Sequence, residues 1–344
     1  MKKKQEPGNL NLTPEARRLL DWLHDLPGKE ERRVVIGQYV ARNANNSNQH
    51  TAASSWEHFY LKVGEQTGKY PGLAGFCFSQ RSVDGAGGEN SPSDCNWREY
   101  AAEHARRGGM LRLMWHAANP WTNETSWSSV PEGHQLAELY TPGNDAYDRW
   151  NGWLSELADC LAWYGEQRIP VLWGPLHEMN GRWFWWGTGE EEQYRRLWCH
   201  MHEYLTGTRG LNHLLWMFCP DARADGDRPL QQYPGNRYVD IIAPDLYYSS
   251  PESQPDSRLY QEFSKPSYGK VLGWGEIGTE KARFIDNRKY MEDIRSHFPL
   301  VTLYMQWADV DAKDRMHPFS IVSNLHTTEL FLDQWGIDRD GIVT

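Results

Sequence analysis

The chain has 344 residues, of which 39% are hydrophobic and 24% charged, a composition that excludes an intrinsically disordered protein. Its formal net charge of −10 argues against nucleic acid or an acidic membrane surface as a partner and is compatible with a neutral substrate. The 18 tryptophans and 17 tyrosines are unusually many. Aromatic rings fill cores, and their flat faces also suit the apolar faces of sugar rings.

Short apolar runs alternate along the chain with longer amphipathic segments. A first helix is predicted to begin at Thr13-Pro14-Glu15, where Thr13 is the N-cap and Pro14 the first helical residue. The predicted strands are Val34–Val40, Leu73–Phe78, Leu111–Trp115, Val171–Leu176, Leu214–Phe218, Val239–Ala243, Val271–Gly275 and Val301–Gln306. The helices predicted between them include Trp97–Arg107, Tyr147–Glu166, Glu191–Thr206 and Lys289–His297.

About eight alternations of strand and helix predict an α/β protein with a closed parallel barrel, the (β/α)₈ or TIM barrel. No low-complexity linker divides the chain, so we expect one domain over residues 1–344. Residues 84–94 (DGAGGENSPSD) and 121–144 are predicted to form long surface loops. Long loops after barrel strands usually carry binding functions, and we therefore expect an open substrate cleft.

Polar side chains follow the predicted strands at the ends where parallel barrels carry their chemistry. They are His116 after the third strand, His177 and Glu178 after the fourth, Asp245 and Tyr247 after the sixth, Glu276 after the seventh, and Trp307, Asp309 and Asp311 after the eighth.

Two of these residues, Glu178 and Glu276, form the pattern of a retaining glycosidase, which needs two carboxyls about 5–5.5 Å apart. Glu178 is followed closely by four aromatic residues, an apolar setting that raises the pKa of a proton donor. Glu276 ends a glycine-rich strand, where glycines would let a ligand approach closely. A lone acid at a strand end more often forms a salt bridge or caps a helix, but two acids in these settings favour catalysis.

Metal chemistry has little support in the sequence. His177 and Glu178 would begin the zinc motif HExxH, but its second histidine position is Gly181. The five cysteines form no CxxC pair, which excludes a zinc ribbon. We therefore expect neither a metal nor a cofactor.

Four segments carry a resemblance to a known family. WHAANPW (115–121), WGPLHEMNGRWFWWG (173–187), YVDIIAPDLYYS (238–249) and GWGEIGT (273–279) resemble glycoside hydrolase family 26, whose best-known members are endo-β-1,4-mannanases. The resemblance covers most of the chain from about residue 34 to 310. It implies a retaining (β/α)₈ glycosidase that acts on a polysaccharide or oligosaccharide.

The resemblance also implies roles for single residues. Glu178 corresponds to the acid/base and Glu276 to the nucleophile. The residues that correspond to the family's substrate-binding set are His116, His177, Trp183, Asp245, Tyr247 and Trp307. Trp185 and Trp186 are not assigned by it, and we expect one to pack in the barrel while the other faces the cleft.

One position departs from the family pattern. Mannanases of the family commonly carry arginine four residues before the acid/base, where this chain has Gly174. The departure predicts the loss of a rigid donor fork near the catalytic carboxylates. It keeps β-1,3-xylan and mixed-linkage β-glucan open as alternative substrates. A non-catalytic carbohydrate-binding barrel is a further alternative, against which both acids argue.

The expected partner is therefore a carbohydrate, with no nucleic acid and no membrane, and we expect a monomer. A polymer substrate favours a secreted or extracellular protein. The N-terminal MKKKQEPGNLNLTPE lacks the apolar stretch of a signal peptide, which leaves a cytoplasmic location as the alternative.

Overall fold

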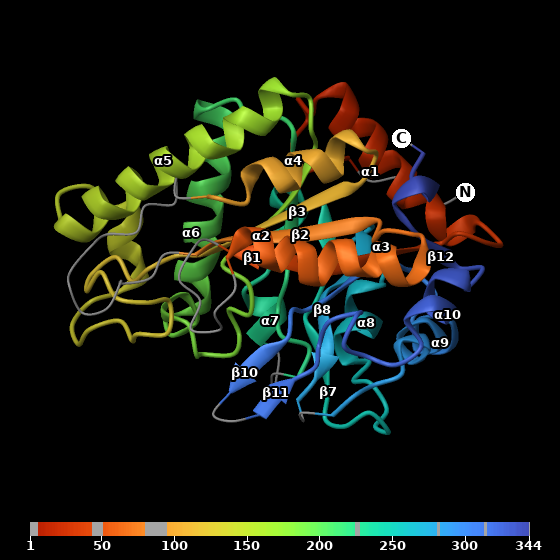
Figure 1. Cartoon of the computed structure of the whole chain (residues 1–344). Helices are drawn as coiled ribbons and strands as arrows, with labels where there is room; N and C mark the ends of the chain where they lie inside the picture. The colour runs from red at the N-terminus through yellow and green to blue at the C-terminus, as the bar shows by residue number, and fades with distance from the viewer. Residues whose placement is uncertain are drawn as a thin grey trace.

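Eight parallel strands close into a barrel, as the sequence predicted (Figure 1). The computed structural model describes residues 6–42, 51–79, 95–223, 228–280, 283–312 and 315–343. The barrel strands are β1 (Val34–Arg42), β2 (Leu73–Ser79), β3 (Met110–His116), β4 (Val171–Pro175), β5 (Leu214–Phe218), β6 (Ile241–Ile242), β8 (Val271–Thr279) and β9 (Val301–Gln306). Each pairs with the next, and β9 pairs with β1 to close the circle.

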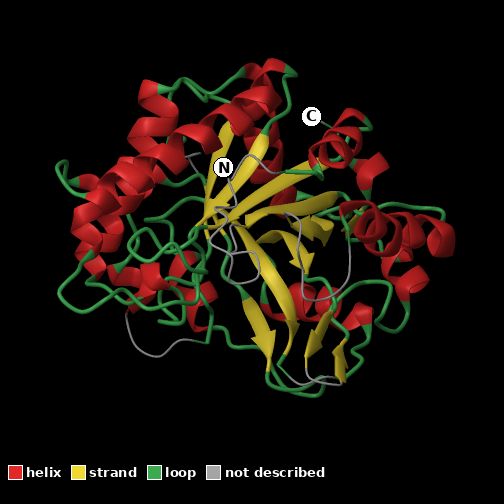
Figure 2. Ribbon diagram, turned by 60° about the vertical axis from the view of Figure 1, so that its left-hand side comes forward, coloured by secondary structure: helices red, strands yellow, loops and turns green. Residues whose placement is uncertain are grey.

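Helices surround the strands, which gather at the centre of the molecule (Figure 2). They are α1 (Pro14–Asp25), α2 (Ala52–Trp56), α3 (Lys62–Thr67), α4 (Arg98–Arg106), α5 (Asp145–Glu166), α6 (Glu191–His202), α7 (Arg228–Gln231), α8 (Arg258–Phe263), α9 (Asn287–His297) and α10 (Thr327–Leu332). Single 3₁₀ or π turns lie at Leu26–Gly28, Glu57–Leu61, Leu136–Tyr140, Trp185–Gly187, Glu203–Thr208, Asn236–Tyr238 and Arg339–Gly341. The remaining strands are β7 (Leu246–Tyr248), β10 (Val310–Ala312), β11 (Arg315–His317) and β12 (Gly336–Ile337).

The predicted element boundaries differ from the structure mainly around the sixth and seventh strands. The sixth is only two residues long, and β7 resumes the same direction after Ala243–Asp245. Because β7 pairs with residues 277–279, the seventh strand continues beyond Glu276 instead of ending there. Glu276 therefore lies within the strand, at the point where the register with β9 shifts between Trp274 and Ile277. The predicted loop at residues 84–94 lies outside the described residues.

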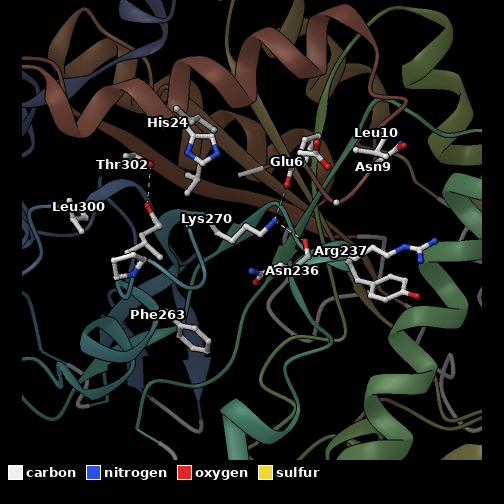
Figure 3. Close-up of a pocket in the computed structure, with 18 of the residues that line it drawn as sticks. Glu6, Asn9, Leu10, His24, Asn236, Arg237, Phe263, Lys270, Leu300 and Thr302 are labelled. Atoms are coloured by element: carbon white, nitrogen blue, oxygen red, sulfur yellow. Dashed lines mark hydrogen bonds between the residues drawn. The ribbon is translucent and has the colours of Figure 1, made fainter. Parts of the chain in front are cut away.

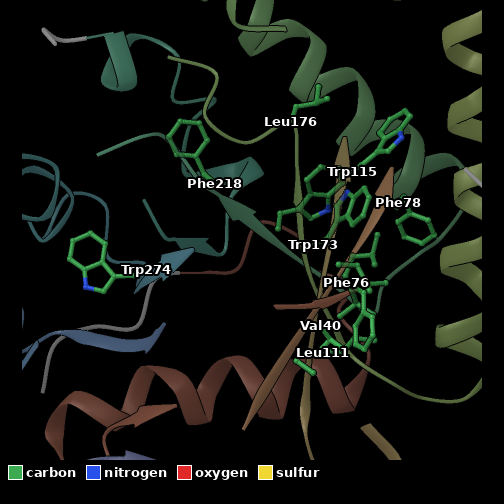
Figure 4. Packing of buried hydrophobic residues seen from close by; sticks show 14 of the residues in the cluster. Val40, Phe76, Phe78, Leu111, Trp115, Trp173, Leu176, Phe218 and Trp274 are labelled. Atoms are coloured by element: carbon green, nitrogen blue, oxygen red, sulfur yellow. The ribbon is translucent and has the colours of Figure 1, made fainter. Parts of the chain in front are cut away.

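Two apolar layers hold the fold together. One fills the barrel, and the other packs the outward faces of the strands against the helices, where Trp115, Trp173 and Phe76 lie close together (Figure 4). Trp115, for example, stacks on Trp150 of α5 with ring centroids 4.8 Å apart. Nine of the 18 tryptophans are fully buried, so at least half of the tryptophans serve the core.

The end of the barrel opposite Glu276 carries a groove of about 1730 Å³ (Figure 3). It is lined by the start of β8 at Val271, by Lys270 and by Leu23 of α1. Chemistry in this fold sits at the carboxyl ends of the strands, so the groove is not the candidate active site. Among the described residues, none of the helices combines the length and apolar character that crossing a bilayer would need.

Candidate active site

The carboxyl ends of the barrel strands bring most of the predicted site residues together. Glu178 follows β4 and Glu276 lies in β8, and both are buried, with exposed fractions of 9% and 4%. His177, Asp245 and Tyr247 contact this pair or lie beside it, as described below.

The backbone around Glu178 adopts an unusual conformation. Leu176 and Glu178 have φ angles of 47° and 52°, in the left-handed region that residues other than glycine rarely adopt. Hydrogen bonds hold this segment: the amide of Glu178 donates to the carbonyl of Cys219 at 2.7 Å, and the Tyr194 hydroxyl donates to the carbonyl of Leu176 at 3.1 Å. Strain of this kind costs about 1–3 kcal/mol and persists where the surroundings over-determine the backbone. The Glu178 carboxyl is therefore held in one place.

Trp183 contacts the Glu178 carboxyl directly. Its indole nitrogen donates to Oε2 of Glu178 at 2.8 Å, and its ring is half-buried. Gly181 makes this position possible, because a Cβ there would lie 2.1 Å from the Trp183 ring. The segment that follows Glu178 thus places an indole N–H donor beside the carboxyl, and this donor orients one of its oxygens.

Glu276 is held from two sides. The Tyr247 hydroxyl donates to Oε2 of Glu276 at 2.7 Å, and Nε2 of His177 lies 3.7 Å from Oε1. His177 in turn makes an edge contact with His116, with ring centroids 4.5 Å apart. Nδ1 of His116 lies 2.9 Å from the thiol sulfur of Cys77.

The glycine before Glu276 serves a different purpose from the predicted one. A Cβ on Gly275 would lie 2.4 Å from Oδ1 of Asp245 and 2.6 Å from the carbonyl of Ala243. The space beside Gly275 is therefore filled by Asp245 and the backbone, not by an approaching ligand. Asp245 is fully buried, and neither of its carboxylate oxygens has a hydrogen-bond partner among the described residues.

The expected loss of a guanidinium at this end of the barrel is wrong for this chain. Arg112, from β3, is fully buried and points into the barrel beside Gly174. It donates to the carbonyl of Gly275 and lies 3.5 Å from the sulfur of Cys219. The sequence signal was an arginine inside an otherwise apolar strand, four residues before His116.

The two glutamates have different electrostatic surroundings. Burial raises the pKa of Glu178 well above its ordinary value, and the charges of Glu276 and Asp221 raise it further. Burial also raises the pKa of Glu276, to about 7, while the charge of Arg112 and the hydrogen bond from Tyr247 oppose the rise. Burial thus favours the protonated form of Glu178, which a proton donor needs, whereas Arg112 and Tyr247 favour the ionised form of Glu276, which a nucleophile needs.

His177 and Asp245 also have shifted pKa values. Burial lowers the pKa of His177 well below its ordinary value, and the neighbouring His116 and Arg112 lower it further, so the imidazole is neutral at pH 7. Burial and the charge of Glu276 raise the pKa of Asp245, against the effect of Arg112.

The aromatic string after Glu178 is buried more completely than predicted. Trp185 and Trp186 are both fully buried, so neither faces a cleft. Their indole nitrogens donate to the carbonyls of Ala117 and His177 at 3.0 and 2.7 Å, because a buried indole N–H needs an acceptor. These two hydrogen bonds tie the tryptophans to the segments that follow β3 and β4.

Trp307 and Trp127 are among the tryptophans that remain accessible near this end of the barrel. Trp307 follows β9, is half-buried and stacks on Tyr39 with ring centroids 3.9 Å apart. Trp127, which the sequence analysis did not single out, is 61% exposed and packs on Phe184 with centroids 4.6 Å apart. No sequence pattern separates such a platform from a core tryptophan, since only its loop position exposes it.

Two acidic residues, Asp309 and Asp311, follow the eighth strand, and the structure describes the side chain of Asp309. Asp309 accepts hydrogen bonds from the amides of Phe319 and Ser320 at 2.9 and 2.8 Å and from the hydroxyl of Ser323. It therefore organises its own loop. The side chain of Asp311 lies outside the described residues.

Within the described residues, one group of three could present ligand atoms to a metal ion: His177, Asp245 and Glu276, whose atoms lie within 4.8 Å of one another. The guanidinium of Arg112 already places a positive charge beside both carboxylates. We therefore assign the group to the carboxylate site described above.

Known proteins are similar to this chain in fold and in sequence. The family model for glycosyl hydrolase family 26 matches residues 9–341. A mannan endo-1,4-beta-mannosidase of Bacillus subtilis (strain 168) is 27% identical over 345 residues, covering 98% of this chain and 89% of that protein. The structure of the Bacillus subtilis mannanase BCman superposes with a TM-score of 0.83 at 26% identity and covers 99% of this chain and 97% of that one.

One relative that matches only part of this chain is named for a different activity. Endoglucanase H of Acetivibrio thermocellus is 28% identical over 220 residues, which cover 57% of this chain and 22% of that protein. The match to the family model, in contrast, spans nearly the whole chain, from residue 9 to residue 341. The protein is a glycoside hydrolase and belongs to glycosyl hydrolase family 26.

Proposed function

We propose that this protein is a retaining endo-β-1,4-mannanase in which Glu178 is the general acid/base and Glu276 the nucleophile. The observation that supports this proposal most directly is the pair of buried glutamates at the carboxyl ends of the strands, each of which accepts a hydrogen bond from an aromatic side chain. Under this proposal the chain is one catalytic domain that works as a monomer on a polysaccharide outside the cell, without a metal or cofactor.

The proposed reaction has two displacements. Glu276 attacks the anomeric carbon while Glu178 gives its proton to the leaving glycosidic oxygen, and the C–O bond to the leaving sugar breaks. Glu178, now ionised, takes a proton from water, whose oxygen attacks the same carbon and releases Glu276. Tyr247 and Trp183 orient one oxygen of each carboxyl, so little reorganisation is needed during the reaction.

The residues around the carboxyls favour a mannose ring as the cleaved sugar. Mannose has an axial 2-hydroxyl, so polar groups near that hydroxyl decide between mannose and its epimers. His116, His177 and Asp245 are polar groups that the family resemblance places around the cleaved sugar, and Asp245 has two carboxylate oxygens without a described partner. Buried polar groups discriminate strongly against a ligand that leaves them unpaired.

A comparison of kcat/KM on mannohexaose, β-1,3-xylohexaose and a mixed-linkage glucan hexamer tests the substrate assignment. We expect mannohexaose to be the best substrate and to be cut at internal bonds, so that short oligosaccharides appear before mannose. If either other hexamer is better by tenfold, which is about 1.4 kcal/mol of transition-state preference, the mannanase assignment is wrong while the catalytic acids stand.

A non-catalytic barrel makes the opposite prediction for the same panel. Such a protein would bind one of the oligosaccharides and release no reducing sugar from any of them.

A further inference from the structure

We propose that Arg112 is the positioning residue of the nucleophile: its guanidinium occupies the interior space that Gly174 leaves open, fixes the backbone before Glu276 and compensates the charges of Glu276 and Asp245. The inference rests on the proposed function, since it assigns Arg112 to the nucleophile of that reaction.

The barrel interior explains why an arginine fits there. β3 and β4 pair so that Arg112 stands opposite Leu172 and Met114 opposite Gly174. The neighbouring inward residues of β3, Met110 and Met114, belong to the apolar filling of the barrel. A Cβ on Gly174 would lie 3.7 Å from Nε of Arg112 and 3.6 Å from the sulfur of Cys219, which is ordinary contact. A longer side chain at this position would need the space that the guanidinium now fills.

Arg112 is fully buried and contacts the backbone next to Glu276. Its side chain donates to the carbonyl of Gly275, the residue that precedes Glu276 in β8. Burial alone would lower the pKa of Arg112, but Cys219, Asp245 and Glu276 together raise it, so the guanidinium stays charged inside the barrel. A fully buried charge is costly, and the negative charges of Asp245 and Glu276 nearby offset part of that cost.

The charged and titratable groups around Glu276 come from several elements. They are Arg112 on β3, His177 and Glu178 after β4, Asp221 and Arg223 after β5, and Asp245 and Tyr247 at β7. His177 is neutral at pH 7, and Arg223 pairs with Asp221 at 2.9 Å. Arg112 is the fully buried cation of the group. Its charge opposes the rise that burial causes in the pKa of Glu276, and it therefore favours the ionised form that a nucleophile needs.

Three variants test this role: Arg112→Met removes the charge at similar length, Arg112→Lys keeps a charge, and Met114→Leu is a matched control in the next interior layer of β3. An opposite charge lowers a carboxyl pKa by about 1–3 units, so we expect the acidic limb of the kcat/KM profile of Arg112→Met to move up by about that much. The limb should move less in Arg112→Lys and stay in place in Met114→Leu. The basic limb, set by Glu178, should not move.

The same shift can be measured without turnover. In protein labelled with ¹³C at the glutamate carboxyls, the Glu276 signal, identified by its absence in Glu276→Gln, should titrate at higher pH in Arg112→Met. This readout remains valid if mannan is not the substrate, so failure of the substrate assignment and failure of the inference are distinguishable. An unchanged Glu276 titration in Arg112→Met would overturn the role of Arg112.

If Arg112→Met does not fold, the role can be tested by moving the arginine from position 112 to position 174. Gly174→Arg crowds a second guanidinium into the barrel, and Arg112→Ala removes the first, so each change alone should lower kcat/KM. The double variant Arg112→Ala/Gly174→Arg keeps one guanidinium in the same space. We expect it to recover at least about tenfold over Arg112→Ala and to return the acidic limb toward its original pH, as one unit of pKa corresponds to a tenfold change in ionisation. A double variant no better than Arg112→Ala contradicts the inference.

Discussion

Replacing Glu276 by alanine should reduce turnover of every substrate by at least about 10⁴-fold, because no covalent intermediate can form without the nucleophile. The loss should be similar for mannohexaose and for an activated aryl β-mannoside, since good leaving groups do not replace the attacking carboxylate. Initial rates on both substrates measure the effect. Glu276 is buried and accepts a hydrogen bond from Tyr247, so the melting temperature of the variant is measured alongside the rates to show that it is folded.

Azide provides the control for this variant. It is small enough to attack the anomeric carbon from the side that Glu276 vacates, and it should restore turnover of the aryl substrate with an α-glycosyl azide as product. A Glu280→Ala variant is a matched comparison, because Glu280 is an acid four residues further along that pairs with Arg223. It should keep most of the activity. Wild-type-like rates in Glu276→Ala would remove Glu276 from the nucleophile role.

Replacing Glu178 by alanine should affect substrates according to their leaving groups. General acid catalysis contributes about 10²–10⁴-fold, so hydrolysis of the polysaccharide should fall by that factor. An aryl mannoside with an acidic leaving group needs little protonation, so its first step should survive while the second step slows. A pre-steady-state burst of phenol followed by a slow steady rate is the expected measurement.

Azide also distinguishes the two glutamates in this variant. It should attack the glycosyl-enzyme in place of activated water and give a β-glycosyl azide, with retained configuration. If azide instead gave the α product with Glu178→Ala, the roles of Glu178 and Glu276 would be reversed. Trp183→Phe is a useful companion, because it removes the indole donor to Glu178 and leaves the carboxyl in place.

The parts of this structure that the sequence could predict are those with a local or periodic signature. The strand–helix alternation predicted the barrel, and the N-cap of the first helix is present as expected, with the Thr13 hydroxyl accepting from the amide of Ala16 at 3.3 Å. The strand-end positions also predicted that His177, Asp245 and Tyr247 would lie close to Glu276, because parallel strands end at one edge.

The remaining features depend on contacts between segments far apart in the chain. Arg112 was not singled out because its significance depends on Gly174 of the adjacent strand and on Gly275 across the barrel. Trp186 lies behind His177 instead of facing a cleft because its indole nitrogen finds the carbonyl of that residue. Neither spacing nor composition encodes which of several adjacent aromatic rings turns inward.

The central claim, that Glu276 forms a covalent bond to the cleaved sugar, can be tested by trapping that intermediate. A 2-deoxy-2-fluoro-β-mannosyl fluoride slows both steps and carries a good leaving group, so the glycosyl-enzyme should accumulate. Mass spectrometry of the intact protein should show one added fluoromannosyl group, and peptide sequencing should place it on Glu276. A label on Glu178 or on any other residue, or an unlabelled enzyme that releases inverted product, would contradict the account.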